Sequence, residues 1–271
     1  MPSQRAPSAN DNAKGARPAP ALLGAFDENL GFPIADPYWR SFFAGYEIDE
    51  LTDLEVMTSQ LLAHKYGFAY LPSANCFFLR SDPFYRGIAS ARSPRSGVPL
   101  QNSVMVVAKS NPVTDWQKLR GARYGYINTF CTTSFFAPSI LLAREGQALQ
   151  SFFNAFAVAP WQGQIDAVVD GSIDVTMVYE DVWLSRAGNA QKTKIIARLD
   201  GLPTPAFIMR ADVSEAFATN LTHQLLTYAA KPMPGALYAG FGPYQDAPMQ
   251  RFFAELERLP GMAKMGGGAR A

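Results

Sequence analysis

Short apolar runs alternate along the chain with amphipathic stretches, and the clearest example lies near the middle. Residues Arg123–Ile127 have the aromatic and β-branched content of a short strand. A polar turn follows, and an apolar stretch then runs to about Arg144 and Gly146, which predicts a helix with a glycine C-cap. Pro138 has no amide hydrogen and fits only a first helical turn, so the helix is expected to begin within Thr133–Phe135.

The same patterns divide the first part of the chain into further elements. Asp36 followed by Pro37 is typical of a helix start, and the aromatic residues after it recur at a spacing that buries one helix face. Residues Leu51–Gln60 fit a strand or the edge of a helix. The other expectations are a strand at Ala21–Phe26, buried aromatic segments at His64–Pro72 and Cys76–Leu79, an arginine-bearing loop at Asp82–Gly97, a strand at Val98–Lys109 and a short helix at Val113–Leu119.

Strands and helices alternate in the second part of the chain. The expected elements are helices at Gln147–Phe156, Gln162–Asp170, Val213–Ala229 and Pro248–Leu259, and extended segments at Ala157–Pro160, Ile173–Tyr179, Lys194–Arg198 and Ala206–Met209. Strand, helix and strand at this spacing predict parallel pairing through right-handed crossovers. Because ligands bind at the carboxyl ends of strands in open α/β sheets, Asn128–Ser134 and Tyr179–Asp181 are expected at a binding edge.

Composition and charge narrow the classes of function. The 271 residues, of which 48% are hydrophobic and 17% charged, suffice for one large domain or two lobes with a buried core. A formal net charge of +1 supplies no general attraction to nucleic acid or anionic lipid, so a bound anion must be held by local geometry. The two cysteines, Cys76 and Cys131, and the two histidines, His64 and His223, are not at metal-ligand spacing, so neither a metal site nor a cofactor is expected.

The two ends of the chain are expected to be disordered tails, at residues 1–18 and 261–271. The apolar run Ala21–Phe26 is too short for the core of a signal peptide, and no other run approaches the roughly 18 apolar residues of a membrane span. The sequence therefore predicts a cytoplasmic location as given, or a periplasmic one if the start of the chain is misassigned.

The polar turn before the central helix is the first candidate for chemistry. Asn128, Thr129 and the run Cys131–Ser134 crowd the start of that helix. Unpaired first-turn amides and the positive end of the helix dipole favour an anion there, and hydroxyl groups add donors. A plainer interpretation makes one of these residues an N-cap and the rest a solvated turn. The position after a strand, ahead of a second strand that ends at Tyr179–Asp181, favours a ligand loop.

Three motifs occur in a fixed order between Val104 and Trp183. They are DWQKLRG at Asp115–Gly121, CTTS at Cys131–Ser134 ahead of Pro138, and the spaced Val, Val, Gly and Asp of Val168–Asp174. This order resembles the PhnD-type substrate-binding proteins of phosphonate, phosphite and phosphate ABC transporters, which are part of the type II periplasmic-binding superfamily. The resemblance is close over the middle third of the chain and extends to the flanks in layout.

The resemblance implies an α/β fold of two lobes, each a mostly parallel sheet flanked by helices. Lobe I would combine residues 19–101 with 205–260, and lobe II would comprise residues 102–204. Crossovers near Ser103–Ala108 and Lys194–Phe207 would form a hinge that closes on a ligand held between the lobes.

The resemblance also implies a set of ligand contacts. The family's anion loop corresponds here to Cys131, Thr132 and Thr133, with Ser134 in place of a glycine, and Trp161 stands where many members have a histidine. Polar or acidic ligand contacts of the family fall on Tyr179, Glu180 and Asp181, and lobe I is expected to close with Phe26, Gln60 and Tyr70. The changed residues Ser134 and Trp161 bear on the identity of the ligand more than on the fold.

Three functions follow from these observations. The leading one is a non-enzymatic protein that binds a small anionic or zwitterionic ligand, such as a phosphonate or phosphate, and serves an ABC transporter permease. A second is a cytoplasmic ligand sensor of the same fold that acts through a regulatory partner. A third is an enzyme that uses Cys131 at a helix N-terminus as a nucleophile, although neither histidine lies in a segment directed at that loop. A nucleic-acid partner is not expected.

Overall fold

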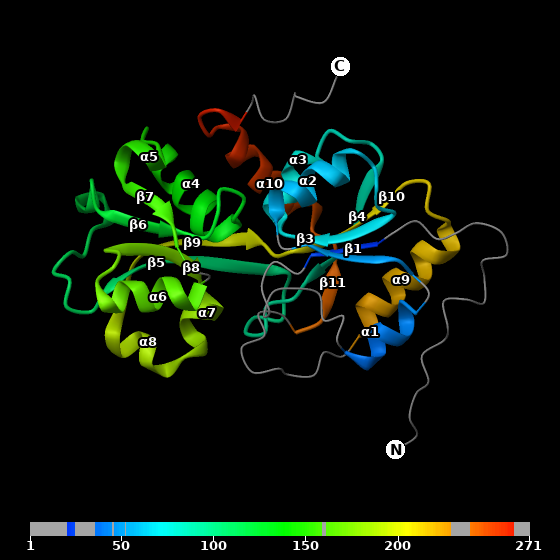
Figure 1. Ribbon diagram of the computed structural model, residues 1–271, viewed down its shortest axis with the longest axis horizontal. Coiled ribbons are helices and arrows are strands. Elements are labelled where there is room, and N and C mark those ends of the chain that lie inside the picture. Colours follow the sequence, from blue (N-terminus) through cyan, green and yellow to red (C-terminus); the bar gives the residue numbers. More distant parts are fainter. Residues whose placement is uncertain are drawn as a thin grey trace.

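The computed structural model places two β-sheets side by side, each with helices on both faces (Figure 1). It describes residues 21–24, 36–44, 46–51, 53–158, 161–228 and 239–262. Because a sheet or helix must bury its apolar face against another layer, helix, sheet and helix stack as three layers in each half.

The first sheet has the strand order β11-β4-β10-β3-β1-β2. Strands β1, β2 and β3 are parallel, whereas β10 runs antiparallel to β3 and β4, and β11 runs antiparallel to β4. One face packs against α1 and α9, and the other against α2, α3 and α10. The bounds are β1 Ala21–Gly24, β2 Ile48–Leu51, β3 Phe68–Leu71, β4 Tyr85–Ala91, β10 Ala206–Arg210, β11 Phe241–Pro243, α1 Pro37–Phe42, α2 Leu54–Leu62, α3 Ser73–Phe78, α9 Glu215–Thr227 and α10 Asp246–Glu257.

The second sheet has the strand order β7-β6-β8-β5-β9. Strands β6, β7 and β8 are parallel, and β5 runs antiparallel to its neighbours β8 and β9. Helices α4 and α5 cover one face, and α6 and α7 the other. The bounds are β5 Leu100–Ala108, β6 Arg123–Tyr126, β7 Asn154–Ala157, β8 Val175–Tyr179, β9 Thr193–Pro203, α4 Ala137–Arg144, α5 Leu149–Phe152, α6 Trp161–Asp170, α7 Glu180–Ser185 and α8 Ala187–Lys192, with a 3₁₀ turn at Trp116–Leu119 and a π-helical turn at Thr132–Phe136.

The chain passes between the sheets at two places. Residues 92–99 lead from β4 into β5, and residues 204–205 lead from β9 into β10. Both connections therefore run through the junction between the two halves.

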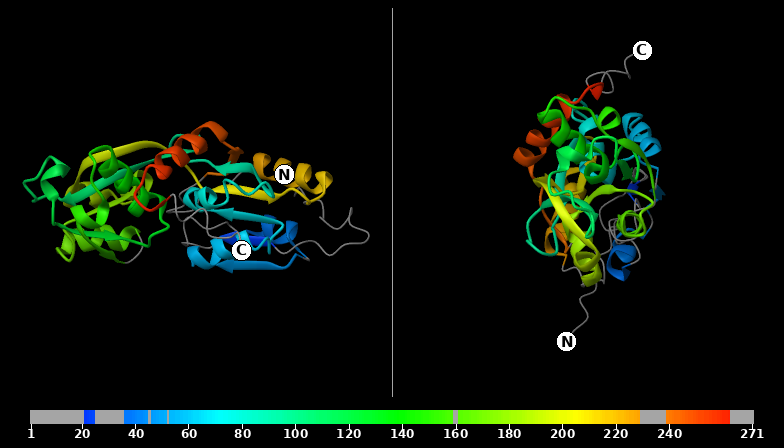
Figure 2. Two further views of the ribbon diagram at one scale, coloured as in Figure 1. Left: turned by 90° about the horizontal axis from the view of Figure 1, so that it is seen from above. Right: turned by 90° about the vertical axis from the view of Figure 1, so that its left-hand side faces the viewer.

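Helix α10 covers that junction, as Figure 2 shows from above. Its apolar side chains, which include Phe253, belong to one buried cluster that contains side chains of both sheets. Arg144 of α4 forms an ion pair with Glu255 of α10 at 3.1 Å, and the ring of Phe78 in α3 lies 5.4 Å from that of Phe130 in the second half. Apolar packing thus continues from one half into the other.

Several sequence expectations are confirmed at the level of single caps. The Asp36 side chain accepts a hydrogen bond from the amide of Tyr38 at 2.9 Å, with Pro37 as the first residue of α1. Gly146 and Gly171 follow α4 and α6 with φ of 69° and 81°, the left-handed conformation that a glycine C-cap adopts. The parallel pairing of β6 with β8 is also present. The sheets are mixed rather than mostly parallel, because the strands that follow or precede the two connections run against their neighbours.

Two expectations about elements were wrong. The segment Asp82–Gly97 is not a loop throughout, because Tyr85–Ala91 forms β4 inside the first sheet. Its small residues carry little of the apolar signal of a strand, yet the lack of bulk lets it lie against large rings. The segment Gln147–Phe156 is helical only at Leu149–Phe152, and its end forms β7 at the edge of the second sheet, where pairing with β6 outweighs helical propensity.

Gly87 tests why β4 contains such small residues. A Cβ atom at this position would lie 2.3 Å from the ring of Tyr244, and a ring cannot yield as a flexible chain end does. We expect Gly87→Ala to lower the free energy of unfolding by about 1–3 kcal/mol in urea titrations. Gly188→Ala is the control, because nothing lies within 4 Å of a Cβ there and alanine favours helix α8. Equal stability of the two variants would contradict this packing.

Candidate functional site

The polar cluster Cys131–Ser134 lies just past β6 and opens directly into the π-helical turn and α4. The helical segment begins at Thr132, one residue before the expected range, because the π-helical turn adds a residue ahead of Pro138. Cys131 is the N-cap, and its Sγ atom accepts a hydrogen bond from the amide of Ser134 at 3.4 Å. Cys131 retains only 5% exposure, and the next three residues have at most 1%.

The side-chain hydroxyls of this cluster are engaged within the protein. Thr132 Oγ1 lies 3.2 Å from Ser73 Oγ and accepts a hydrogen bond from the amide of Ala74 at 3.2 Å, so it joins the second half to the start of α3 in the first. The Oγ atom of Ser134 accepts a hydrogen bond from the amide of Ile127 at 3.0 Å, and Thr133 Oγ1 lies 3.5 Å from the Cys131 sulfur. The hydroxyls therefore shape the loop from inside.

Unlike these hydroxyls, the backbone amides of Thr132 and Thr133 have no partner among the described residues. Within the described part of the chain, neither amide donates to an acceptor, although both residues are buried. The first amides of any helix lack an acceptor within the helix, and because a buried amide without an acceptor is costly, these two are available to a ligand. The starts of α3 and of the π-helical turn also meet here, and both present the positive end of a helix dipole. The arrangement suits an oxyanion.

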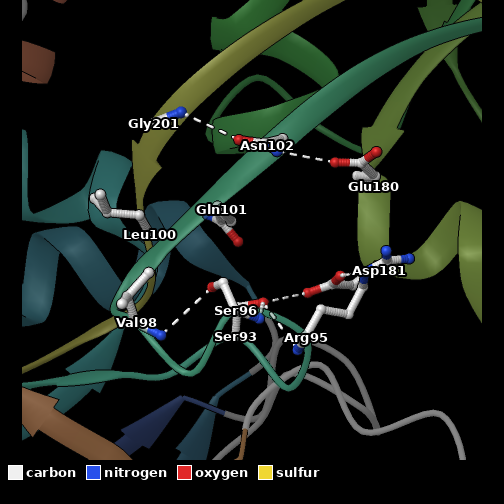
Figure 3. A pocket seen from close by; sticks show the side chains of 10 residues that line it. All are labelled: Ser93, Arg95, Ser96, Val98, Leu100, Gln101, Asn102, Glu180, Asp181 and Gly201. Carbon is white, nitrogen blue, oxygen red and sulfur yellow. Dashed lines mark hydrogen bonds and ion pairs between the residues drawn. The ribbon is translucent and has the colours of Figure 1, made fainter.

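A cavity of about 440 Å³ opens beside α7, at the connection between β4 and β5 (Figure 3). Seven of the ten residues that line it have polar or charged side chains, and two adjacent carboxylates from the start of α7 face it. The lining residues are Ser93, Arg95, Ser96, Val98, Leu100, Gln101, Asn102, Glu180, Asp181 and Gly201. The structure thus brings together Glu180 and Asp181, as the sequence predicted for the end of β8, with residues of the inter-sheet connection.

The two carboxylates of this cavity have different surroundings. Glu180 accepts hydrogen bonds from Arg198 at 2.5 Å and Asn102 at 2.9 Å. Burial alone would raise the pKa of Glu180, but these two donors outweigh burial, and the pKa lies below its ordinary value.

Asp181 is less well compensated than its neighbour. It accepts a hydrogen bond from Ser93 at 2.8 Å, and the nearest cation, Arg95, is 3.6 Å away. Burial therefore dominates and raises the pKa of Asp181 above its ordinary value. Of the two carboxylates, Asp181 is the one that a further positive charge would stabilise most.

Tyr179 links the cavity to the polar loop. It is buried in one apolar cluster with Cys131, and it hydrogen-bonds Gln101, which lines the cavity. Burial raises the pKa of Tyr179 well above its ordinary value, so the phenol is neutral. The loop and the cavity are therefore neighbouring parts of one region at the carboxyl ends of β6 and β8.

The structure does not gather every residue that the sequence nominated. Gln60 lies near the end of α2 and accepts hydrogen bonds from Lys65 and Tyr66. Because these two residues precede β3, Gln60 lies beside the amino end of that strand, away from its carboxyl end. Tyr70 is fully buried, with its ring 5.6 Å from that of Phe207 on the α1 and α9 face of the first sheet.

Two nominated side chains are not covered by the structure. Phe26 lies outside the described residues, and Trp161 begins α6 but its side chain is not described. Their contacts with a ligand stay predictions.

Sequence reasoning missed most of the cavity wall. Ser93, Arg95 and Ser96 belong to a segment that the sequence marked only as a positive loop, and Gln101 and Asn102 open a strand whose later residues are apolar. The run of serine and arginine next to a predicted connection was the available signal. Ser73 carried no signal, because both of its partners, Thr132 and the carbonyl of Pro203, lie far from it in the sequence.

The histidines do not approach Cys131. His64 Nε2 lies 2.7 Å from Asp82, and its ring lies 4.4 Å from that of Phe84 in the first half. His223 belongs to α9, on the opposite face of the first sheet from the buried cluster that joins the halves. Among the described residues, His, Cys, Asp and Glu side chains form no group of three or more that could hold a metal ion.

The model of a protein family matches residues 46–247, about three quarters of the chain; the family is described as the periplasmic substrate-binding protein of phosphonate ABC transporters. The chain belongs to this family. It is therefore related by descent to transport receptors for small anions, a class of binding proteins rather than enzymes, and normally periplasmic. A search of curated proteins finds no match.

Solved structures support the fold. A phosphonate-transporter binding protein of Pseudomonas aeruginosa has a TM-score of 0.69 at 14% identity, covering 93% of this chain and 94% of its own. PhnD1 of Prochlorococcus marinus, solved with methylphosphonate, has a TM-score of 0.68 at 13% identity over 89% and 98%. A Xanthomonas citri protein solved with ATP has a TM-score of 0.66 at 16% identity over 93% and 100%.

These likenesses show that the α/β fold of this chain, with helices on both faces of its sheets, is shared by the three solved proteins. Of the helices that the structure describes, none has both the length and the apolar character to cross a membrane.

The thiols provide a test of the nucleophile hypothesis. Burial raises the pKa of Cys76 to about 12, so almost no thiolate forms at neutral pH, and Cys131 is buried with its sulfur engaged as an N-cap. We expect iodoacetamide to label both cysteines far more slowly than free glutathione at pH 7, with urea-unfolded protein as the control. Rapid labelling of Cys131 in the folded protein would instead support the hypothesis that Cys131 is a nucleophile.

Proposed function

We propose that this protein is the ligand-binding receptor of an ABC transporter and holds a small phosphonate- or phosphate-like anion between its two halves. The observation that carries the proposal is the pair of buried amides at Thr132 and Thr133, which have no acceptor in the described part of the chain. Family membership supplies the transport context. The earlier expectation of a cytoplasmic sensor with a regulatory partner stays a prediction from the sequence.

In this proposal the two halves are lobes that move on the two connections. Lobe I comprises residues 19–101 and 205–260, and lobe II comprises residues 102–204. Closure brings Ser73 and the amide of Ala74 to Thr132, as the distances of 3.2 Å between these groups support. Hinge closure of this kind encloses a ligand and removes water from it.

The oxyanion end of the ligand would meet the amides of Thr132 and Thr133. Two adjacent donors at a helix start give charge-assisted hydrogen bonds, which are the stronger class. The side chains of Cys131 and Ser134 support these donors by holding the turn. A net charge near zero is compatible with anion binding because the donors are local.

The organic end of the ligand would occupy the cavity beside α7. Glu180 is committed to Arg198 and Asn102, so Asp181 is the carboxylate that can meet a ligand ammonium group. A positive charge near Asp181 would stabilise its ionised form, which burial disfavours. An aminoalkylphosphonate is therefore the ligand class that uses both the loop and the cavity.

A proline at position 132 tests the amide directly. Cys131 has an extended backbone with φ −72° and ψ 121°, which the residue before a proline requires, and the first helical position accepts proline. Thr132→Pro removes the amide donor and the hydroxyl, whereas the control Thr132→Val removes only the hydroxyl. By titration calorimetry with methylphosphonate and phosphate, we expect Thr132→Pro to bind at least about tenfold more weakly than Thr132→Val, or about 1.4 kcal/mol. Equal affinities would argue against an amide-bound oxyanion.

Asp181→Asn tests the organic end. Loss of the carboxylate should weaken an aminoalkylphosphonate about tenfold and leave methylphosphonate nearly unchanged. In the wild type, the preference for the amine should fall as the pH is lowered through the pKa of Asp181, which lies above the ordinary range, because protonation removes the negative charge. The variant should lack that pH dependence. Asp200→Asn is the matched control, since Asp200 also lies near Arg198, at 3.8 Å, but does not line the cavity. If both variants changed the preference alike, the cavity would not be the amine site.

A further inference from the structure

At the π-helical turn, the backbone carbonyls of Thr133 and Ser134 depend on a donor that the helix lacks. The amide of Ala137 donates to the carbonyl of Thr132, five residues back, which sets the wide turn. The next amide position is Pro138, which has no hydrogen. Pro138 would otherwise serve the carbonyl of Thr133 in a π-helix or that of Ser134 in an α-helix.

Two buried hydroxyls of the second sheet take the place of that missing donor. Tyr124 of β6 donates its hydroxyl to the carbonyl of Ser134 at 2.8 Å. The hydroxyl of Ser103 in β5 lies 3.4 Å from the carbonyl of Thr133 and 3.3 Å from that of Val178, so its single hydrogen is shared between these two acceptors. Both residues are fully buried, so water cannot replace them in this role.

The Tyr124 side chain is held rigidly in this position. Its ring stacks on that of Phe153, with the centroids 4.9 Å apart and the planes at 27°. The hydroxyl therefore reaches the carbonyl from a fixed point on the sheet, and the sheet itself determines where the turn lies.

We propose that Tyr124, assisted by Ser103, is a positioning residue for anion binding, because its hydroxyl holds the π-helical turn in the form that directs the amides of Thr132 and Thr133 at the ligand. The proposal rests on the function proposed above. Without this hydroxyl, the carbonyl of Ser134 is buried with one donor fewer, and the first turn relaxes away from the geometry in which both amides point to one place.

Tyr124→Phe is the direct test, because phenylalanine keeps the ring stack and removes only the hydroxyl. Tyr85→Phe is the matched control: the hydroxyl of Tyr85 donates to the carbonyl of Tyr66 at 3.1 Å in the first half, remote from the loop. We expect Tyr124→Phe to bind methylphosphonate and phosphate about tenfold more weakly, and Tyr85→Phe to bind like the wild type, at similar stability in urea.

A second substitution separates positioning from general stability. Pro138→Ala supplies an amide hydrogen that can serve the carbonyl of Ser134 in place of the tyrosine hydroxyl. In the double variant we therefore expect Tyr124→Phe to cost clearly less affinity than it does in the wild type, which is a coupling that a purely structural role would not produce. Additive losses would overturn the proposal.

A readout without ligand distinguishes this inference from the proposed function. Amide hydrogen exchange at Thr132, Thr133 and Ser134 should be faster in Tyr124→Phe than in Tyr85→Phe. Wild-type protein that binds no oxyanion would refute the proposed function, whereas unchanged exchange and unchanged affinity in Tyr124→Phe would refute the positioning role alone. Ser103→Ala, measured in the same way, replaces Tyr124→Phe if that variant does not fold.

Discussion

A buried peptide group must find a hydrogen-bond partner, and this constraint governs the region where the two halves meet. At the start of α4, proline removes one donor, and two amides have no acceptor in the described chain. The hydroxyl of Tyr124 in the adjacent sheet serves the carbonyl of Ser134, and the amide of Ala74 in the other half donates to the hydroxyl of Thr132. A loop built in this way has little freedom. It is shaped by the sheet beneath it, through the hydroxyl of Tyr124.

The same region is where the chain changes sheets. Both connections pass the junction, the cavity is lined by one of them, and Ser73 donates to the carbonyl of Pro203 beside the other at 3.0 Å. Polar contacts between the halves thus lie next to the proposed ligand site, and the apolar packing under α10 joins the halves as well. A change of ligand state can act on the angle between the halves through these polar contacts.

The sequence alone was a good guide where local rules decide the structure. Caps at Asp36 and Gly171, the parallel βαβ order and the polar cluster after β6 all follow from short-range chemistry, and the order of motifs identified the family. It failed for β4, whose residues lack bulk because Tyr244 fills the space above Gly87. Gln60 was nominated by the resemblance rather than by local chemistry, and it bonds Lys65 and Tyr66 ahead of β3. The cavity wall and the role of Tyr124 depend on residues far apart in sequence, and no local pattern could reveal them.

The arrangement of β10 has a consequence for the order in which the protein can be assembled on the ribosome. The second sheet comes from one continuous stretch, 100–203, and can fold as soon as that stretch has emerged. The first sheet cannot, because β10 is the strand that joins β3 to β4, and it is made only after the whole second sheet. While the other half forms, β4 therefore has no strand to connect it with β1, β2 and β3. The half that is made first is completed last.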